Sequence, residues 1–345
     1  GTGINIFLSS MDSTLLSLTL SAAKTIDVKY TIGIYFSLFI MILMLILVAI
    51  LFTNITEKRI MPRLPRVEHE ESEVVITNKE LRGLIIGCAA GVLFLLIVKI
   101  VILPYNIVMT KKEFASYIDH TLLNTEAGVK NIIKLCQEAV SYEVASVCVN
   151  PIYVPLAVSE LENTNVKVCT VVGFPLGAST TVDKVHETKT AIKNGADEID
   201  MVMNIGAAKD GRYSLVSSDI AAVVKCARKE GKKLNKQIIV KVILETCLLD
   251  DYTIGNCCLC AKKAGADFVK TSTGFANPKS TDGNLLPNGA SEYHVKLMKK
   301  IVGSDMKVKA SGGIRSTKMA LTMIAAGADR IGTSNGVSIM ENFVE

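Results

Sequence analysis

The sequence predicts an α/β protein whose larger part is a closed (β/α)8 barrel, the TIM-barrel fold, preceded by an N-terminal segment with two transmembrane helices. Two observations predict the barrel: from Met109 onward, short β-branched runs alternate with helical stretches, and a glycine-containing pattern recurs three times. Two long apolar stretches before residue 105 predict the membrane segment. We therefore expect two units, residues 1–108 and residues 109–345.

The first unit contains two stretches long enough to cross a bilayer as helices. Residues 31–52 carry no charge, and residues 84–103 carry only Lys99, which lies near one end of the stretch. The connection between them is rich in Lys and Arg, which is typical of a cytoplasmic loop. Two spans would then place residues 109–345 on the opposite side of the membrane.

The recurring pattern reads NGADEIDMV, AGADFVKTS and AGADRIGTS, beginning at residues 194, 264 and 326. In each copy a glycine is placed to end a helix, and an apolar strand follows Ala-Asp. Further strands are expected between and before these copies, in the segments YIDHTLL, VASVCVN, KVCTVVGF, IIVKVILET and MKVKASG. Eight βα units in a stretch of this length predict a closed barrel, although the pattern also allows an open doubly wound sheet.

Composition limits the classes of function. The net charge is +5 without a long basic run, so no nucleic-acid partner is expected. The four histidines form no HxH or HExxH motif, and we expect neither a metal nor a cofactor. The nine cysteines are scattered as in a reduced protein, and Cys257 and Cys260 form a CxxC that we interpret as buried thiols on a packed helix.

Charged residues interrupt the apolar strands at their expected C-terminal ends, where barrels of this kind carry their active sites. These are Asp200, Lys270 and Lys309. The two lysines lie on neighbouring strands, and one ammonium beside another favours a neutral amine, which is the nucleophile that Schiff-base formation requires. Lys241, on the fifth strand, is a rival for either lysine's role. Asp200 is either a proton shuttle or an ion-pair partner.

Glycines follow the last three strands and predict a phosphate-binding site. Gly274 ends TSTG, Gly312 and Gly313 lie in SGGIR, and Gly332 lies in IGTS. Loops after the last strands of a barrel often bind phosphate through backbone N–H groups, and glycine lets the backbone approach closely. We therefore expect a small phosphorylated substrate.

The motifs YIDHTLL, VCVNP, VVGFPLG, EIDMVMN, VKTSTGF and VKASGGIRS, read in order, make residues 109–345 similar to the deoxyribose-phosphate aldolase family. The resemblance implies reversible cleavage of 2-deoxy-D-ribose 5-phosphate to D-glyceraldehyde 3-phosphate and acetaldehyde, without a metal. It implies that Lys270 forms the imine, that Lys309 favours the neutral amine of Lys270, and that Asp200 is the acid/base.

The same resemblance implies further site residues. Asp119 matches a carboxylate that holds the second lysine, and Cys148 matches a thiol that lines the pocket. The residues expected to contact the substrate and its phosphate are Thr273, Gly274, Gly312, Gly313, Gly332 and Ser334. The long polar loop at residues 274–290 is expected to shape the mouth of the pocket.

Residues 1–105 resemble an internal piece of the p-aminobenzoyl-glutamate transporter family, through MDSTLLSLTLSAAKTID, TEKRIMPRL, ELRGLIIGCAAG and ILPYN. Such transporters need more than two spans, so no transport is expected. The aldolase unit is expected in the cytoplasm, which conflicts with the two-span orientation, and at a membrane if the first segment is retained. A homodimer is left open.

Two alternative functions also stay open. One is another Schiff-base aldolase of the same fold that acts on a different phosphorylated sugar. The other is a membrane transport or anchoring protein whose barrel is catalytically idle.

Overall fold

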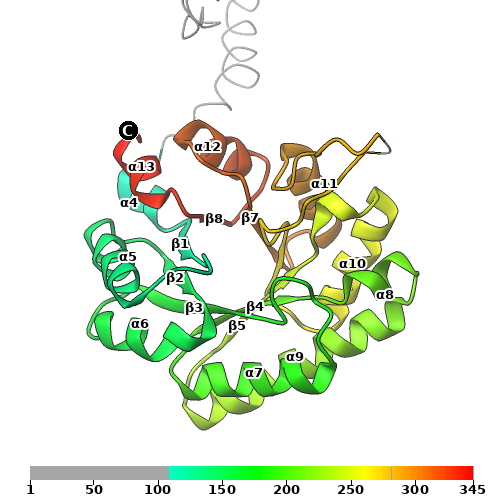
Figure 1. Cartoon of the computed structure of the whole chain (residues 1–345), viewed down its shortest axis with the longest axis horizontal. Coiled ribbons are helices and arrows are strands. Elements are labelled where there is room, and N and C mark those ends of the chain that lie inside the picture. The colour runs from blue at the N-terminus through cyan, green and yellow to red at the C-terminus, as the bar shows by residue number, and fades with distance from the viewer. Residues whose placement is uncertain (1–108, 281, 345) are drawn as a thin grey trace, which may run out of the picture. The chain divides into compact units, whose positions relative to one another are not determined.

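Eight short strands alternate with helices in this computed structural model, which describes residues 109–280 and 282–344 (Figure 1). The strands are β1 Ile118–Leu122, β2 Ser146–Val149, β3 Lys167–Val172, β4 Glu198–Val202, β5 Ile239–Ile243, β6 Phe268–Lys270, β7 Lys307–Ser311 and β8 Arg330–Thr333. The helices are α4 Lys111–Ala115, α5 Val129–Ser141, η5 Pro151–Tyr153, α6 Val154–Glu160, α7 Thr181–Lys193, α8 Ile205–Lys209, α9 Tyr213–Lys233, η6 Thr246–Leu248, α10 Asp251–Lys263, α11 Glu292–Val302, α12 Thr317–Ala325 and α13 Gly336–Glu341.

The strands form a closed parallel barrel in sequence order, with the helices as an outer ring (Figure 1). Closure is made by β1 and β8, where Ile118 lies opposite Ile331. The barrel prediction is therefore confirmed, and the open doubly wound sheet is excluded. The transmembrane predictions at 31–52 and 84–103 lie outside the described residues. Within residues 109–280 and 282–344, no helix is both long and apolar enough to cross a membrane.

The recurring sequence pattern is a structural repeat that connects a helix to the next strand at three places in the barrel. Its glycines, Gly195, Gly265 and Gly327, all have positive φ, as expected for residues that end a helix. The aspartate after each one accepts a hydrogen bond from a backbone N–H of the preceding strand; these aspartates are Asp197, Asp267 and Asp329. The pattern therefore sets the start of a strand against its neighbour three times around the barrel.

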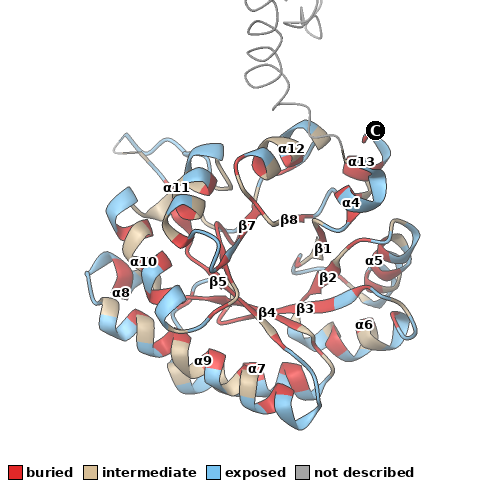
Figure 2. Cartoon of the chain, turned by 180° about the vertical axis from the view of Figure 1, so that it is seen from behind, coloured by how far each residue is buried: buried red, intermediate tan, exposed pale blue. Residues whose placement is uncertain are grey.

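The apolar core lies between the strands and the inner faces of the helices, while the outer helix faces are exposed (Figure 2). In α5, for example, Ile132, Leu135, Cys136 and Ala139 are buried at the spacing of one helical face. The CxxC prediction is also confirmed: Cys257 and Cys260 are free thiols buried on α10. Burial raises the pKa of Cys257 to about 12.

The two ends of the described chain pack against each other. Phe114 of α4 stacks on Phe343, which follows α13, with ring centroids 4.4 Å apart. A capping box between Thr110 and Glu113 begins α4. The packed unit therefore includes the residues directly after Met109.

Candidate active site

The interior of the barrel contains a layer of buried charged side chains. Lys270 ends its strand as predicted, but the prediction that Asp200 and Lys309 lie at strand ends is wrong, because each is the third residue of a five-residue strand. Strand register brings these residues together, because Asp200 of β4 lies opposite Lys241 of β5, and Lys270 of β6 lies opposite Lys309 of β7. All four side chains are at most 3% exposed as residues. Buried charges require partners, and the contacts within this layer supply them.

Asp200 is the centre of the layer and contacts three ammonium groups. Its Oδ2 accepts hydrogen bonds from Lys270 at 2.8 Å and from Lys309 at 2.7 Å, and its Oδ1 accepts one from Lys241 at 2.8 Å. Burial acts to raise the pKa of Asp200, but the three lysines outweigh it and hold the pKa well below its usual range. Asp200 is therefore a carboxylate at neutral pH.

Asp119 contacts the second lysine, as the family resemblance implies. Its Oδ2 lies 2.5 Å from the Nζ of Lys309, and its Oδ1 accepts hydrogen bonds from Arg330 at 2.5 Å and from Ser146 at 2.6 Å. Burial acts to lower the pKa of Lys309, but Asp119 and Asp200 hold it above its usual range. Lys309 is therefore a fixed cation next to Lys270.

The rival lysine, Lys241, lies deeper in the barrel. Its Nζ is 2.5 Å from Glu198 Oε2 and 3.4 Å from Asp119 Oδ2, in addition to its bond to Asp200. The side chain of Lys241 is fully buried and does not reach the cavity above the layer. These contacts leave it no face toward a substrate.

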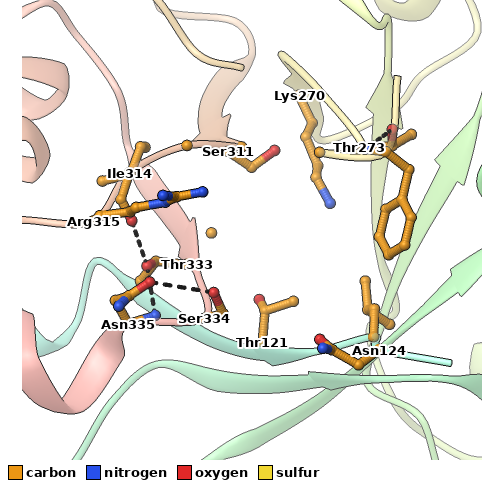
Figure 3. Close-up of a pocket in the computed structure, with 16 residues that line it drawn as sticks. Thr121, Asn124, Lys270, Thr273, Ser311, Ile314, Arg315, Thr333, Ser334 and Asn335 are labelled. Atoms are coloured by element: carbon orange, nitrogen blue, oxygen red, sulfur yellow. Dashed lines mark hydrogen bonds between the residues drawn. The ribbon is translucent and has the colours of Figure 1, made fainter. Parts of the chain in front are cut away.

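Lys270 is the lysine of the layer that borders an open cavity. A cavity of about 230 Å³ lies above the charged layer, and Lys270 belongs to its wall, whereas Lys241 and Lys309 do not. Figure 3 shows the Lys270 amine directed into this space, with Thr121 and Arg315 on other sides of it. Lys270 therefore combines access to a ligand with a direct bond to Asp200.

The glycine turns predicted to bind phosphate meet at the same cavity. Its wall includes all of the predicted residues of this group, namely Thr273, Gly274, Gly312, Gly313, Gly332 and Ser334. Gly312 and Gly313 have φ values of 84° and 72°, which glycine adopts without strain. Gly332 must be glycine for a different reason, because a Cβ there would lie 2.9 Å from Cε of Lys309.

Cys148 does not occupy the predicted place on the pocket wall. It is fully buried in a small apolar cluster with Cys169, the residue opposite it on β3. Cys169 contacts Asp200 Oδ1 at 3.2 Å. Cys148 is absent from the cavity wall, which the VCVNP motif alone did not indicate.

Within the described residues, one group has donor atoms close enough together to hold a metal ion. Its members are Cys148, Cys169 and Asp200, whose donor atoms lie within 4.8 Å of one another. Asp200 already contacts three ammonium groups. A metal cation at this position would meet that positive charge, so we assign no metal role to the cluster.

Several residues of the site were not predicted. Arg315 lies on the cavity wall and carries a positive charge beside the glycine turn. Its signal was its position two residues after Gly313 in SGGIR. Thr121 and Asn124, which follow the β1 motif, also line the cavity. Glu198 and Arg330, at the first positions of β4 and β8, gave no signal in the sequence.

A barrel that brings a lysine, a carboxylate and glycine turns to one cavity is an enzyme scaffold, and comparisons with known proteins identify the class. The DeoC/LacD family aldolase model matches residues 114–343. This chain belongs to that aldolase family, a class of lyases.

Individual relatives agree with the family match. Deoxyribose-phosphate aldolase of Clostridium tetani (strain Massachusetts / E88) is 52% identical over 229 residues, which are 66% of this chain and 98% of the relative. The enzyme of the same name from Streptococcus pneumoniae (strain Taiwan19F-14) is 56% identical over 225 residues, covering 65% of this chain and 94% of the relative. A tetrameric structure of deoxyribose phosphate aldolase from Aeropyrum pernix has 35% identity and a TM-score of 0.60, covering 68% and 92%.

A second family model, of AbgT transporters, matches residues 1–146. The match supports the resemblance noted for residues 1–105, and it extends into the aldolase match. In the structure, the shared stretch contains β1 and α5, and β1 pairs with β2 and β8 of the barrel.

Proposed function

We propose that residues 109–345 are a deoxyribose-phosphate aldolase that works through a Schiff base on Lys270. The observation that carries the proposal is the position of Lys270, whose amine borders the cavity and bonds to Asp200 at 2.8 Å. The relatives of that name, at 52% and 56% identity, support the choice of substrate. The substrate is 2-deoxy-D-ribose 5-phosphate in its open-chain form.

The reaction begins when the neutral amine of Lys270 attacks the C1 aldehyde and loses water to form a protonated imine. Asp200, acting through a water molecule, accepts the proton of the C3 hydroxyl. The C2–C3 bond breaks, its electron pair moves to the imine, and glyceraldehyde 3-phosphate leaves. The resulting enamine takes up a proton at C2, and water releases acetaldehyde from Lys270.

The charged layer supports these steps because its side chains hold one another in their ionised forms. Lys309 and Lys241 hold Asp200 as a carboxylate, and Asp119 fixes Lys309 in contact with it. The positive charge of Lys309 opposes a second charge on Lys270 and so favours the neutral nucleophile. At the other side of the cavity, Arg315 and the N–H groups of the Gly312–Gly313 turn are suited to the phosphate.

The test is reductive trapping of the imine. The protein is incubated with acetaldehyde and sodium borohydride, digested, and analysed for a peptide that carries one added ethyl group on Lys270. Lys270→Met should lose the adduct, while Lys299→Met, a change at a lysine paired with Asp329 at 2.9 Å outside the charged layer, should keep it. An unmodified Lys270 in the wild-type protein would refute the proposal and would favour a catalytically idle barrel.

A different phosphorylated sugar is the second candidate, because the long loop at residues 274–290 borders the site. Phe275 lies on the cavity wall, and Asn288 donates a hydrogen bond to the carbonyl of Ala276 at 2.8 Å, which joins the two ends of this loop. Release of acetaldehyde from 2-deoxyribose 5-phosphate supports the favoured substrate. A trapped imine without acetaldehyde release would favour the second candidate.

We also propose that residues 1–108 and 109–345 are separate units and that the aldolase unit acts in the cytoplasm. The match to the second unit alone covers 98% and 94% of the two aldolase relatives. The mass of the protein isolated from its natural source tests whether both units are present in one chain. A homodimer of the aldolase unit stays a proposal, and light scattering measures it.

A further inference from the structure

Glu245 is a buried carboxylate that the mechanism above does not use. It lies two residues after the end of β5, is 1% exposed, and has a left-handed backbone with φ 60° and ψ 59°. A residue with a side chain beyond Cβ adopts this conformation at an energetic cost. A strained and buried acid beside an active site needs a structural reason, and its hydrogen bonds supply one.

The carboxylate of Glu245 binds Thr273 at two points. The backbone N–H of Thr273 lies 3.2 Å from both Oε1 and Oε2, and the hydroxyl of Thr273 donates a short hydrogen bond to Oε2. The backbone N–H of Thr246 also donates to the carbonyl of Thr271 at 2.9 Å, which joins the same two loops. Glu245 therefore holds both the position and the hydroxyl direction of a cavity residue.

The remaining hydrogen-bonding capacity of the Thr273 hydroxyl can be counted. A hydroxyl has one hydrogen to donate and two lone pairs to accept with. The hydrogen is directed to Glu245, and one lone pair accepts from the backbone N–H of Phe275 at 3.0 Å. One lone pair is left, so toward a ligand in the cavity Thr273 is an acceptor and not a donor.

We infer that Glu245 is a positioning residue that turns the Thr273 hydroxyl into a fixed acceptor, so that the site selects a substrate hydroxyl at this point over a carbonyl or ether oxygen. The inference rests on the proposed function, because it concerns a hydroxyl of the sugar phosphate. Acetaldehyde has no hydroxyl. The Glu245–Thr273 pair therefore acts on cleavage of the sugar and not on formation of the acetaldehyde imine.

The experiment compares two reactions in the full chain: cleavage of 2-deoxyribose 5-phosphate, and borohydride trapping of acetaldehyde on Lys270. Glu245→Gln should lower kcat/KM for cleavage by about 10- to 100-fold, since the amide is uncharged and replaces one acceptor oxygen with an NH2 donor, which weakens the charge-assisted bonds from Thr273. The rate of trapping should stay within about twofold of wild type. Glu230→Gln, a change at a buried carboxylate of α9 that pairs with Lys233, is the matched control and should leave both rates unchanged.

A double-variant cycle tests whether Glu245 acts through Thr273. Thr273→Val should show a loss similar to that of Glu245→Gln, and the double variant should be no worse than the poorer single variant by more than about twofold. Losses that multiply, or a fall in trapping equal to the fall in cleavage, would overturn the inference.

Two further outcomes keep the test decisive. If Glu245→Gln does not fold, the comparison moves to Thr273→Ser, which keeps the hydroxyl and should retain cleavage, and Thr273→Val, which should not. Equal cleavage by these two variants would overturn the inference while trapping on Lys270 still supported the proposed function. A wild-type chain that traps no acetaldehyde would instead remove the proposed function itself, and the inference with it.

Discussion

Replacement of Lys309 with methionine removes a fully buried charge and should lower both stability and activity. The Lys309 ammonium lies 2.5 Å from Asp119 Oδ2 and 2.7 Å from Asp200 Oδ2. Removing one partner of a buried ion pair typically costs about 3–5 kcal/mol. Both carboxylates keep other cations, so we expect about 3 kcal/mol, which lowers the Tm of a domain of this size by about 6–12 °C.

The effect on activity follows from the distance between Lys309 and Lys270. Both amines bond to the same oxygen of Asp200, so they are no more than about 5.5 Å apart. At an effective dielectric constant of about 20, two positive charges at this distance repel by about 3 kcal/mol. Lys309→Met removes this positive charge from beside the reacting amine, and imine formation at pH 7 should slow by about 100-fold.

The assay measures the rate of borohydride trapping with acetaldehyde at pH 7, together with thermal unfolding. Lys309→Met should trap acetaldehyde more slowly than wild type and unfold at a lower temperature. Lys299→Met is the control, since Lys299 is one-third exposed and pairs with Asp329 at 2.9 Å, a contact worth about 0–1 kcal/mol. A Lys309→Met protein that unfolds and reacts like wild type would refute this account of the charged layer.

Three further predictions concern the same cavity. Gly332→Ala should lower kcat by about tenfold or more with a smaller change in KM, because its Cβ would meet Lys309 Cε at 2.9 Å and displace the charged layer; steady-state kinetics measure this. Arg315→Met should raise KM for the phosphorylated sugar by about 10- to 100-fold and leave acetaldehyde trapping unchanged, because Arg315 borders the cavity away from the imine; equal losses in both would contradict a phosphate role. The pKa values of Asp119 and Asp200 are lowered, so their ion pairs contribute stability at neutral pH and lose it only as the pH falls below the usual value of 3.8. Urea unfolding should therefore show no loss of stability from this source between pH 7 and pH 5, and a loss near pH 3. Asp200→Asn should reduce that loss.

The sequence alone determined the architecture of residues 109–345 and the chemical type of the site. All eight expected strand segments contain a strand of the barrel, and the recurring glycines end helices at the expected places. Strands of a parallel barrel are buried on both faces, so they appear as apolar runs whatever their neighbours are. For the same reason a lysine or aspartate within such a run stands out, which is how Asp200, Lys270 and Lys309 were found.

The tertiary structure decided which lysine faces the substrate. Lys241 and Lys270 both follow apolar residues on their strands, so the residue pattern does not distinguish them, and only the family resemblance favours Lys270. Lys270 is the last residue of β6 and lies level with Ile243, whereas Lys241 lies level with Phe268, two positions lower. A side chain at the strand end reaches the cavity, and one nearer the middle of the strand is enclosed by the barrel. The depth of Cys148 was decided in the same way.

Contacts between residues far apart in the chain were also decided only by folding. Glu245 and Thr273 lie on different loops, and the sequence around either residue gives no sign that the carboxylate of Glu245 binds the hydroxyl of Thr273. Arg330 and Asp119 meet because β8 closes on β1. Sequence patterns report whether each segment is buried or exposed. Hydrogen-bond partners depend on register and on barrel closure, which are properties of the whole sheet.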